Sequence, residues 1–399
     1  VGISFFTFQT ISYIIDIYRG QVKPVTRFTD YGFFVSFFPQ LVAGPIVRAS
    51  QFVPQLYKEY SVSQAEFGMA IFMILKGLFK KLFIGDFIAL NLIDRVFANP
   101  VSYSGFENLM GLYGYSLQVY CDFSVYTDMA IGLALLMGFR LPKNFNSPYK
   151  ALNCGDFWKR WHMSLSSWLK DYLYIPMGGN RGASPFTYIS LTLMLTVIVL
   201  LSGKLWLVPV FAGIIGLFAL IMYLVPAFRL TVSTNINLMM TMLIGGLWHG
   251  ASWMFVIWGG LNGLGVVVYK LWRKISPWEN SNHWVARFWK IFITFNFITF
   301  TRIWFRGESM QGTMDLMNQV AGNFGWAQVP AMLLSYWRVF AIMLLGYLLH
   351  WLPGALKDKW MNRFVAAPVY VKVIISSLVV FIVYQSISSG LQPFIYFQF

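Results

Sequence analysis

The chain has 399 residues, of which 57% are hydrophobic and only 11% are charged, against about 25% charged residues in an average soluble domain. This composition excludes an ordinary soluble protein and predicts an all-α, polytopic integral membrane protein. The formal net charge is +15. The basic residues stand between apolar runs, so membrane topology and anionic lipid head groups explain them better than binding to nucleic acid does.

Long apolar runs identify the predicted membrane segments, and they indicate about ten of them, because about 20 apolar residues cross a bilayer as a helix. The clearest runs lie at 67–95, 109–137, 186–203, 205–226, 238–269, 331–352 and 371–386, and shorter or more polar runs at 1–17, 31–47 and 289–305. We expect a single membrane domain, 1–399. Because Val1 opens inside an apolar run, we also expect further N-terminal membrane helices before it.

Helix breakers end the run 31–47. In the stretch FFPQLVAGPIVR, Pro39, Gly44 and Pro45 precede Arg48. This pattern predicts a broken or kinked helix that ends near a membrane interface.

Two carboxylates stand inside the run 109–137. Asp122 and Asp128 are six positions apart and therefore do not share a helical face. Intramembrane acids rarely face lipid, so each is expected to line a polar cavity or to bond a neighbouring helix. Cys121 could carry an acyl group as a thioester, but a small buried core residue is the simpler interpretation. With Cys154 it makes only two cysteines, which implies no disulfide framework.

The most basic region between spans is 140–181, which the positive-inside rule places in the cytoplasm. A basic loop can also attract a phosphate-bearing substrate. A second basic stretch, 270–290, would lie on the opposite side if 186–203, 205–226 and 238–269 each crossed once. We therefore expect either that one of these runs is not a full crossing or that 238–269 is broken.

Residues 156–172 predict one amphipathic helix lying flat on the membrane, capped by Asn153 or Asp156. At 100° per residue one arc carries Trp158, Trp161, Leu165, Trp168, Leu169 and Tyr172, and the rest carries Lys159, Arg160, Ser164, Ser167, Lys170 and Asp171. An aromatic face opposite a cationic face is typical of an in-plane helix. His162 falls at the edge of the apolar arc, so its imidazole is expected to point from the surface toward the protein interior. It is either a functional histidine or an interfacial anchor.

His249 is the sharpest single candidate, because no Asp, Glu, Lys or Arg occurs from Leu238 to Tyr269. An ionisable group at such depth is a functional hypothesis by default. The flanking Gly245 and Gly250 permit tight helix contact or a local break. Burial favours neutral imidazole, which is the form that a general base requires. The alternative is a core histidine hydrogen-bonded between helices.

Several blocks of the chain resemble the membrane-bound O-acyltransferase family, most closely its bacterial alginate O-acetyltransferase-like branch. The strongest are NFNSPYKALNCGDFWKRWHMSLSSWLKDYLYIPMGGNR (Asn144 to Arg181) and GGLWHGASW. Supporting blocks are GISFFTFQTISYIIDIYRG, FFPQLVAGPIVR, YSLQVYCDFSVYTDMAIGLA and the terminal PFIYFQF. They occur in the family's order and cover nearly the whole chain. The run 186–235 departs from the family and is interpreted as an insertion.

The resemblance implies a multi-helix bundle with a tunnel through a bacterial inner membrane. An acyl thioester would enter from the cytoplasm and an acceptor hydroxyl from the other face. In polysaccharide acetylation the membrane protein passes acetyl to a periplasmic partner within a polymer export complex. We therefore expect acetyl-CoA as the donor substrate, with no further cofactor, no metal and no nucleic acid.

The resemblance also assigns roles to residues. The family's deep histidine corresponds to His249 and the histidine of its Trp-His-x-Ser-Leu-Ser motif to His162, and both are expected to be catalytic. The expected substrate-binding residues are Trp161, Ser164, Ser166, Trp248, Asn262, Asp122 and Asp128. The cations expected to hold the phosphates of the donor are Lys143, Lys150, Lys159 and Arg160.

Three other functions stay open. A sister group transfers D-alanine from a carrier protein to teichoic acids and shares the Trp-His-x-Ser-Leu-Ser block, but it lacks YIPMGGNR, which favours acetyl here. A transporter or flippase of an acylated precursor also needs intramembrane polar groups, yet the chain shows no internal repeat. A structural scaffold for an export complex predicts no thioester binding.

Overall fold

The structure is a computed structural model that describes residues 2–41 and 43–386, and the regular secondary structure in this part is helical, without a strand. The prediction of an all-α fold is therefore confirmed. The contacts group the chain into two units: unit 1 comprises Val1–Leu165 and Asn282–Phe399, and unit 2 comprises Ser166–Ser281. The terminal block PFIYFQF lies outside the described residues.

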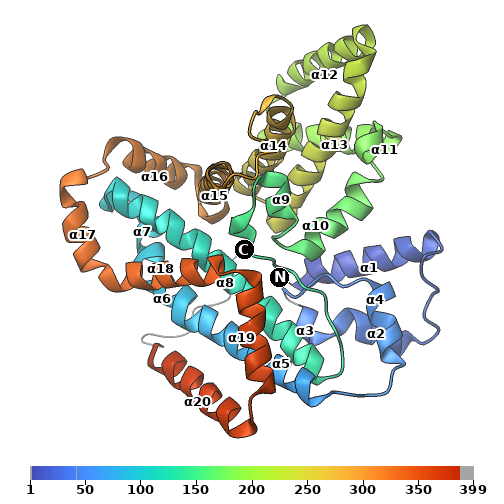
Figure 1. Ribbon diagram of the computed structural model, residues 1–399. Helices are drawn as coiled ribbons and strands as arrows, with labels where there is room; N and C mark the ends of the chain where they lie inside the picture. The colour runs from blue at the N-terminus through green and yellow to red at the C-terminus, as the bar shows by residue number, and fades with distance from the viewer. Residues whose placement is uncertain (1, 42, 387–399) are drawn as a thin grey trace. The chain divides into compact units, whose positions relative to one another are not determined.

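Unit 1 contains most of the helices (Figure 1). They are α1 (Gly2–Tyr18), α2 (Phe28–Ser36), α3 (Phe38–Leu41), α4 (Ala49–Leu56), α5 (Gln64–Leu78), α6 (Asp86–Ile88), α7 (Asp94–Ala98), α8 (Gly105–Leu136), α9 (Cys154–Trp158), α15 (Trp284–Arg306), α16 (Met310–Gly322), α17 (Val329–Ser335), α18 (Trp337–Trp351), α19 (Gly354–Ala366) and α20 (Val369–Ser386). Helix α10 (Met163–Leu169) crosses the boundary between the units.

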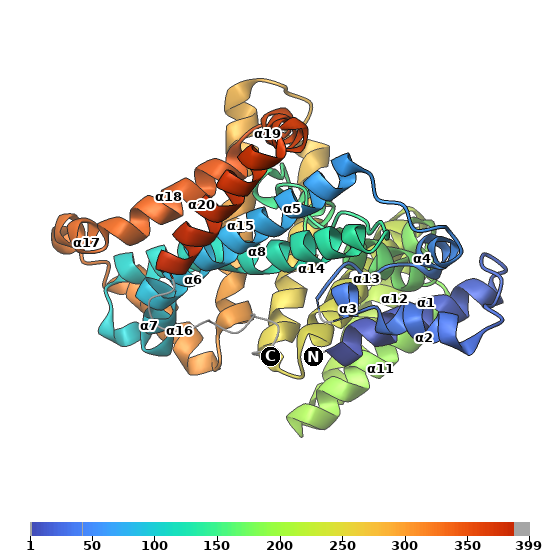
Figure 2. The ribbon, with the colours of Figure 1, turned by 90° about the horizontal axis from the view of Figure 1, so that it is seen from below.

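Helix α8 is the core of unit 1 and contacts α5, α15, α16 and α18. It begins at a capping box, in which the Ser104 hydroxyl accepts from the backbone N–H of Glu107 and the Glu107 carboxylate accepts from the N–H of Ser104. Figure 2 shows α5 running beside α8. Their close approach requires Gly132, because a Cβ there would lie 2.8 Å from the carbonyl oxygen of Ala70.

The run 67–95 forms part of a continuous helical segment that carries charge into unit 1. Helix α5 continues through the π-helical stretches Phe79–Gly85 and Ala89–Ile93 to the end of α7. The π-helical turns accompany Lys81, whose ammonium lies 2.7 Å from Asp86 Oδ1 and 3.0 Å from Asp122 Oδ1. This segment is therefore bound to α8 by ion pairs and is not a purely apolar span.

The prediction of a membrane segment at 31–47 is wrong. Helix α2 ends at Ser36, the four-residue α3 follows, and residues Gly44–Arg48 have no helical structure. The helix breakers identified in this stretch account for the interruption. Farther along, α17 and α18 form a pair bent by 84° rather than one straight span over 331–352.

Unit 2 contains α11 (Pro185–Ser202), α12 (Leu207–Leu224), α13 (Pro226–His249) and α14 (Trp253–Ile275). Helices α13 and α14 pack against each other along their length (Figure 1). The run 238–269 is therefore broken after His249. This break is one of the two alternatives expected from the positions of the basic stretches. Four helices thus lie between Arg181 and Ser276. Four crossings would put 140–181 and 270–290 on the same side, as the positive-inside rule requires, but α11 is a shorter apolar helix and is not among the candidate spans.

The described residues include four helices long and apolar enough to cross a membrane, or five if the bent pair α17 and α18 counts as one span. By this measure the prediction of about ten segments is too high, because several runs are shorter, broken or charged. The four are α8, α12, α13 from Phe228 and α14. None of the residues of α12 is buried in the protein, which is expected of an apolar helix that faces lipid.

Candidate functional site

The segment predicted as one in-plane helix over 156–172 is two short helices separated by a turn. Helix α9 ends at Trp158, α10 begins at Met163, and a π-helical stretch follows over Lys170–Tyr174. The predicted cap is confirmed at Asn153, whose side-chain oxygen accepts from the N–H of Asp156 at 2.8 Å. The single helix was wrong because His162 has φ +46°, a left-handed conformation that interrupts a right-handed helix.

A single amide, Asn144, holds this turn. Its Oδ1 accepts from the backbone N–H of Ser164 at 3.0 Å, from the Ser164 hydroxyl at 2.9 Å and from Nδ1 of His162 at 3.2 Å. An amide oxygen is only an acceptor, so the His162 proton is on Nδ1. Both His162 and Ser164 are buried. The prediction that His162 points inward is confirmed, and the placement of Ser164 on an outer polar face is wrong.

Aromatic rings and one cation surround the same turn. The edge of Phe123 meets the His162 ring at 4.5 Å between centroids. The guanidinium of Arg302, from α15, lies 4.5 Å from the centroid of the Trp161 ring, a cation–π contact. Arg302 is 1% exposed, and its Nε and Nη2 have no hydrogen-bond partner among the residues that the structure describes. A permanently charged group is thus buried beside the motif.

A cavity of about 710 Å³ opens in unit 1 between α5, α8, the strap 139–147, the end of α18 and α19. We call it the lysine cavity. Its lining includes apolar side chains of α5 and α8, and its charged residues are Glu66, Lys76, Lys80, Asp128, Arg140, Lys143, Lys357 and Asp358. Five cations against three carboxylates, in a partly apolar chamber, suit an anionic ligand with an apolar part.

Only one of the two predicted carboxylates lines this cavity. Asp128 lines it and binds Lys76 at 2.9 Å and Lys80 at 2.7 Å. Asp122 is not among the lining residues and pairs instead with Lys81, on the neighbouring helical segment. Asp128 therefore meets both expected alternatives, a cavity lining and a bond to a neighbouring helix, whereas Asp122 meets only the second.

Lys357, in α19, and His350, in α18, also line the cavity. The ammonium of Lys357 donates to the His350 carbonyl at 2.8 Å and to the Ser147 hydroxyl at 3.1 Å. Burial, together with the neighbouring Lys150 and other lysines, lowers the pKa of Lys357 to about 8. Burial is the larger cause, and the neighbouring cations disfavour the charged form further.

Of the four cations predicted to hold the donor phosphates, only Lys143 lines the lysine cavity. Lys150 donates to the carbonyl of Leu352 at 2.7 Å. Arg160 pairs with Asp156 at 2.9 Å, an i,i+4 ion pair, and Lys159 is exposed. The position of these cations in the sequence did not show which of them bind nearby groups and which one faces the cavity.

In unit 2, His249 is the last residue of α13 and lies among aromatic rings. The edge of its ring contacts Trp248 at 4.8 Å and Trp258 at 5.0 Å between centroids. A parallel contact at 6.3 Å joins it to Phe255. Gly250 is essential to this packing, because a Cβ there would come within 2.5 Å of the Phe255 ring. The predicted break thus places the imidazole at a helix end.

Unit 2 contains two further predicted substrate-binding residues, Asn262 and Ser166. Asn262 is buried one helical turn after Trp258, and its amide donates to the Trp258 carbonyl at 2.8 Å. Ser166 is half-buried in α10. Within residues 2–41 and 43–386 no group of three or more His, Cys, Asp or Glu is placed to hold a metal ion.

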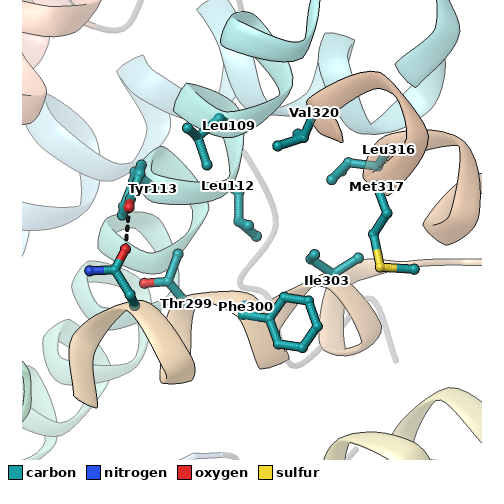
Figure 3. Close-up of a pocket in the computed structure, with 10 residues that line it drawn as sticks. Leu109, Leu112, Tyr113, Thr299, Phe300, Ile303, Leu316, Met317 and Val320 are labelled. Carbon is teal, nitrogen blue, oxygen red and sulfur yellow. Dashed lines mark hydrogen bonds between the residues drawn. The ribbon is translucent and has the colours of Figure 1, made fainter. Parts of the chain in front are cut away.

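A second pocket, of about 310 Å³, lies in unit 1 between α8, α15 and α16 (Figure 3). Leu109, Leu112 and Phe300 point into it, and Tyr113 bonds Asn296 at one end. It offers almost no polar surface, so it is unsuited to acyl-transfer chemistry.

Sequence reasoning missed Lys357, His350 and Arg302. His350 had a usable signal, because it is an ionisable residue inside the apolar run 331–352, the same criterion that singled out His249. Arg302 gave the same signal inside 289–305. Lys357 gave no such signal, because a lysine in the charged segment GALKDKWMNR is ordinary.

Comparison with known proteins identifies relatives that are similar in sequence over most of the chain. A model described as "MBOAT, membrane-bound O-acyltransferase family" matches residues 25–201. A protein of Pseudomonas aeruginosa described as "Probable alginate O-acetylase AlgI" is 36% identical over 353 residues, 84% of this chain and 56% of the relative. The peptidoglycan O-acetyltransferase of Helicobacter pylori is 34% identical over 351 residues, 82% of this chain and 57% of the relative.

A more distant relative is the teichoic acid D-alanyltransferase of Bacillus subtilis. It is 28% identical over 314 residues, 77% of this chain and 68% of the relative. The chain spans about half the length of the first curated relatives that it matches.

Proposed function

Because the chain belongs to the membrane-bound O-acyltransferase family and is a multi-pass membrane protein, we propose that it transfers an acetyl group from cytoplasmic acetyl-CoA for O-acetylation of an exported polysaccharide. The observation that carries this proposal is the similarity to two relatives named for O-acetylation, at 36% and 34% identity over 84% and 82% of the chain. The relative named for D-alanyl transfer is 28% identical, which favours acetyl as the transferred group.

His249 is the general base in this proposal. Its neutral imidazole takes the proton of the acceptor hydroxyl while the hydroxyl oxygen attacks the thioester carbonyl. The C–O bond forms, the C–S bond breaks, and CoA leaves as the thiolate. A positioned general base contributes roughly 10²–10⁴-fold to the rate. The contacts of the half-buried His249 with Trp248, Phe255 and Trp258 support this role, because they fix the orientation of its ring. Trp248 and Asn262 are the proposed donors to the oxyanion.

The lysine cavity is the proposed site for the phosphates of the donor. Lys143 keeps the role expected of it, and Lys76, Lys80 and Lys357 join it. This assignment is supported by the excess of cations over carboxylates in the cavity lining and by the lowered pKa of Lys357. Lys150, Lys159 and Arg160 are left out of this proposed site, because none of them lines the cavity.

His162 is the proposed second histidine of the reaction. It orients the thioester end of the donor or protonates the leaving thiolate. Its Nδ1–H is committed to Asn144, so Nε2 is the nitrogen that faces this task. Trp161, Ser164 and Ser166 belong to the same motif and position the donor beside it.

The proposed setting is a bacterial inner membrane, with a periplasmic acetyltransferase partner and a polysaccharide export complex as acceptor system. The positive-inside rule supports a cytoplasmic position for 140–181. The partner's hydroxyl or a sugar hydroxyl is the acceptor at His249.

The test is turnover of acetyl-CoA by the purified full-length protein in detergent. We expect His249→Gln to release CoA at least 100-fold more slowly than wild type. The matched control is His283→Gln, which alters an exposed histidine at the start of α15. Wild-type turnover by His249→Gln, with folding verified, would remove His249 from the mechanism. Turnover only with a D-alanyl carrier protein would establish the sister activity, and no thioester turnover at all would favour a transporter or scaffold.

A further inference from the structure

His350 lines the lysine cavity and is locked in one protonation state by the backbone. It is 3% exposed, and its Nε2 accepts a hydrogen bond from the backbone N–H of Tyr149 at 3.2 Å. A backbone amide only donates, so Nε2 carries no proton and the ring proton is on Nδ1. A second proton on the ring would break the bond to Tyr149. His350 is therefore a fixed N–H donor and is unsuited to act as a general base or acid.

The Nδ1–H of His350 has no acceptor in the part of the chain that the structure describes. Two cations lie near this residue. Lys357 binds the carbonyl of His350, and Lys80 lies 5.4 Å over the ring of Tyr120, which meets His350 edge-on at 4.5 Å between centroids. A buried donor that lacks an acceptor costs free energy. A ligand that brings an acceptor oxygen here removes this cost.

The charged groups around His350 indicate which kind of oxygen would accept a hydrogen bond from its Nδ1–H. One neutral N–H donor flanked by ammonium groups suits an oxygen that carries negative charge, because charge-assisted bonds are the stronger ones. Asp128, one of the carboxylates that line the cavity, is already shared by Lys76 and Lys80. The cavity is also partly apolar, which suits a ligand with a less polar segment beside its charge.

We infer that His350 recognises a phosphoryl oxygen of the thioester donor through Nδ1–H, and that it is a specificity residue of the lysine cavity. This inference rests on the proposed function, because it takes the ligand to be the donor. A phosphate on a lipid head group offers the same oxygen, and the test separates the two sources.

The experiment uses two substitutions that each retain one half of the histidine. His350→Gln places an amide where Nε2 was and can still accept from Tyr149, but it loses the donor at Nδ1. His350→Asn retains an N–H near Nδ1 and loses the acceptor. Calorimetric titration of the full-length protein with CoA, in a neutral detergent, gives the affinities. A bond to a charged acceptor predicts that His350→Gln binds CoA about tenfold more weakly or worse, whereas His350→Asn stays closer to wild type.

Pantetheine, which lacks the phosphates, is the matched ligand control. We expect His350→Gln to leave the affinity for pantetheine unchanged. Equal losses for both ligands, or wild-type CoA binding by His350→Gln, would overturn the inference, while acetyl-CoA turnover by wild type would leave the proposed function standing. If wild type binds vesicles rich in phosphatidylglycerol, sensitively to His350→Gln, and does not bind CoA, the phosphate belongs to a lipid and the donor assignment fails.

A measurement on wild type covers the case in which both variants unfold. The chain has four histidines, so ¹⁵N-imidazole spectra are simple to assign. His350 should be the Nδ1–H tautomer, and its ring signals should shift when CoA is added. A protonated or Nε2–H ring, or no shift on binding, would refute the inference.

Discussion

The side-chain oxygen of Asn144 lies 3.2 Å from Nδ1 of His162 and 2.9 Å from Oγ of Ser164. One amide, 18 positions before the histidine, thus fixes two residues of the Trp-His-x-Ser-Leu-Ser block. The same Ser164 hydroxyl accepts from the backbone N–H of Ile46 at 2.9 Å. The left-handed turn at His162 is costly for a residue with a side chain, so these long-range bonds are what hold it in place.

Replacement of Asn144 tests this relationship. Asn144→Leu leaves the buried N–H groups of Ser164 and His162 without their acceptor, at about 1–3 kcal/mol for each unsatisfied donor. We expect a clear fall in the unfolding temperature of the detergent-solubilised protein, followed by tryptophan fluorescence. Asn144→Asp retains an acceptor of the same shape and should unfold closer to wild type. Equal midpoints for Asn144→Leu and wild type would show that the turn is held by other contacts.

Gly250 should be intolerant of any side chain. A Cβ at this position would come within 2.5 Å of the Phe255 ring, so Gly250→Ala must displace the ring that packs on His249. We expect acetyl transfer to fall at least tenfold, since small misplacements of a reacting group can reduce rates by about 10². The control is Gly260→Ala, whose Cβ would meet only Leu243, at an ordinary 3.5 Å. Full activity of Gly250→Ala would show that the placement of Phe255 does not matter for catalysis.

Replacement of the buried Arg302 by an apolar residue is expected not to lower the unfolding temperature. Burying a charge without a carboxylate partner is unfavourable, and apolar residues of similar volume often replace buried charges at no cost. Arg302→Met is therefore expected to unfold at the wild-type temperature or above it. Arg302→Lys retains the charge but loses the planar stacking on Trp161, so it should unfold at a lower temperature. The opposite order in a thermal melt would mean that Arg302 has an acceptor that neutralises it.

The sequence predicted local features well and long-range ones poorly. The break after His249 followed from an apolar run too long for one span, and the inward direction of His162 followed from helical periodicity. The interruption at His162 itself did not, because periodicity assumes an unbroken helix, whereas the bonds to Asn144 come from a distant strap. The lysine cavity was beyond reach for the same reason, since Lys80, Lys143 and Lys357 come together only through the packing of α5, the strap and α19.

The last prediction concerns the pH dependence of donor binding. The pKa of Lys357 is about 8 because burial and the neighbouring lysines disfavour its charged form. A bound phosphate favours that charged form, so the affinity for CoA is full below about pH 8 and falls as the pH rises to 9, by up to tenfold per unit for one proton. The phosphate monoester, with a second pKa of about 6, is already doubly charged in this window and adds no slope. The other charged or titratable groups that face or adjoin Lys357 are Lys76, Lys80, Lys143, Lys150, Asp128, Asp358 and His350.

Calorimetric titrations of CoA at pH 7, 8 and 9, in buffers of different ionisation enthalpy, measure both the affinity and the proton taken up. Lys357→Arg remains charged throughout this range and should bind without the decline, because a guanidinium does not deprotonate there. Lys357→Gln should bind more weakly at pH 7 and equally at pH 9. A decline between pH 8 and 9 that persists in Lys357→Arg would assign the titrating group to another lysine, since the deprotonation of Lys357 is then not its cause.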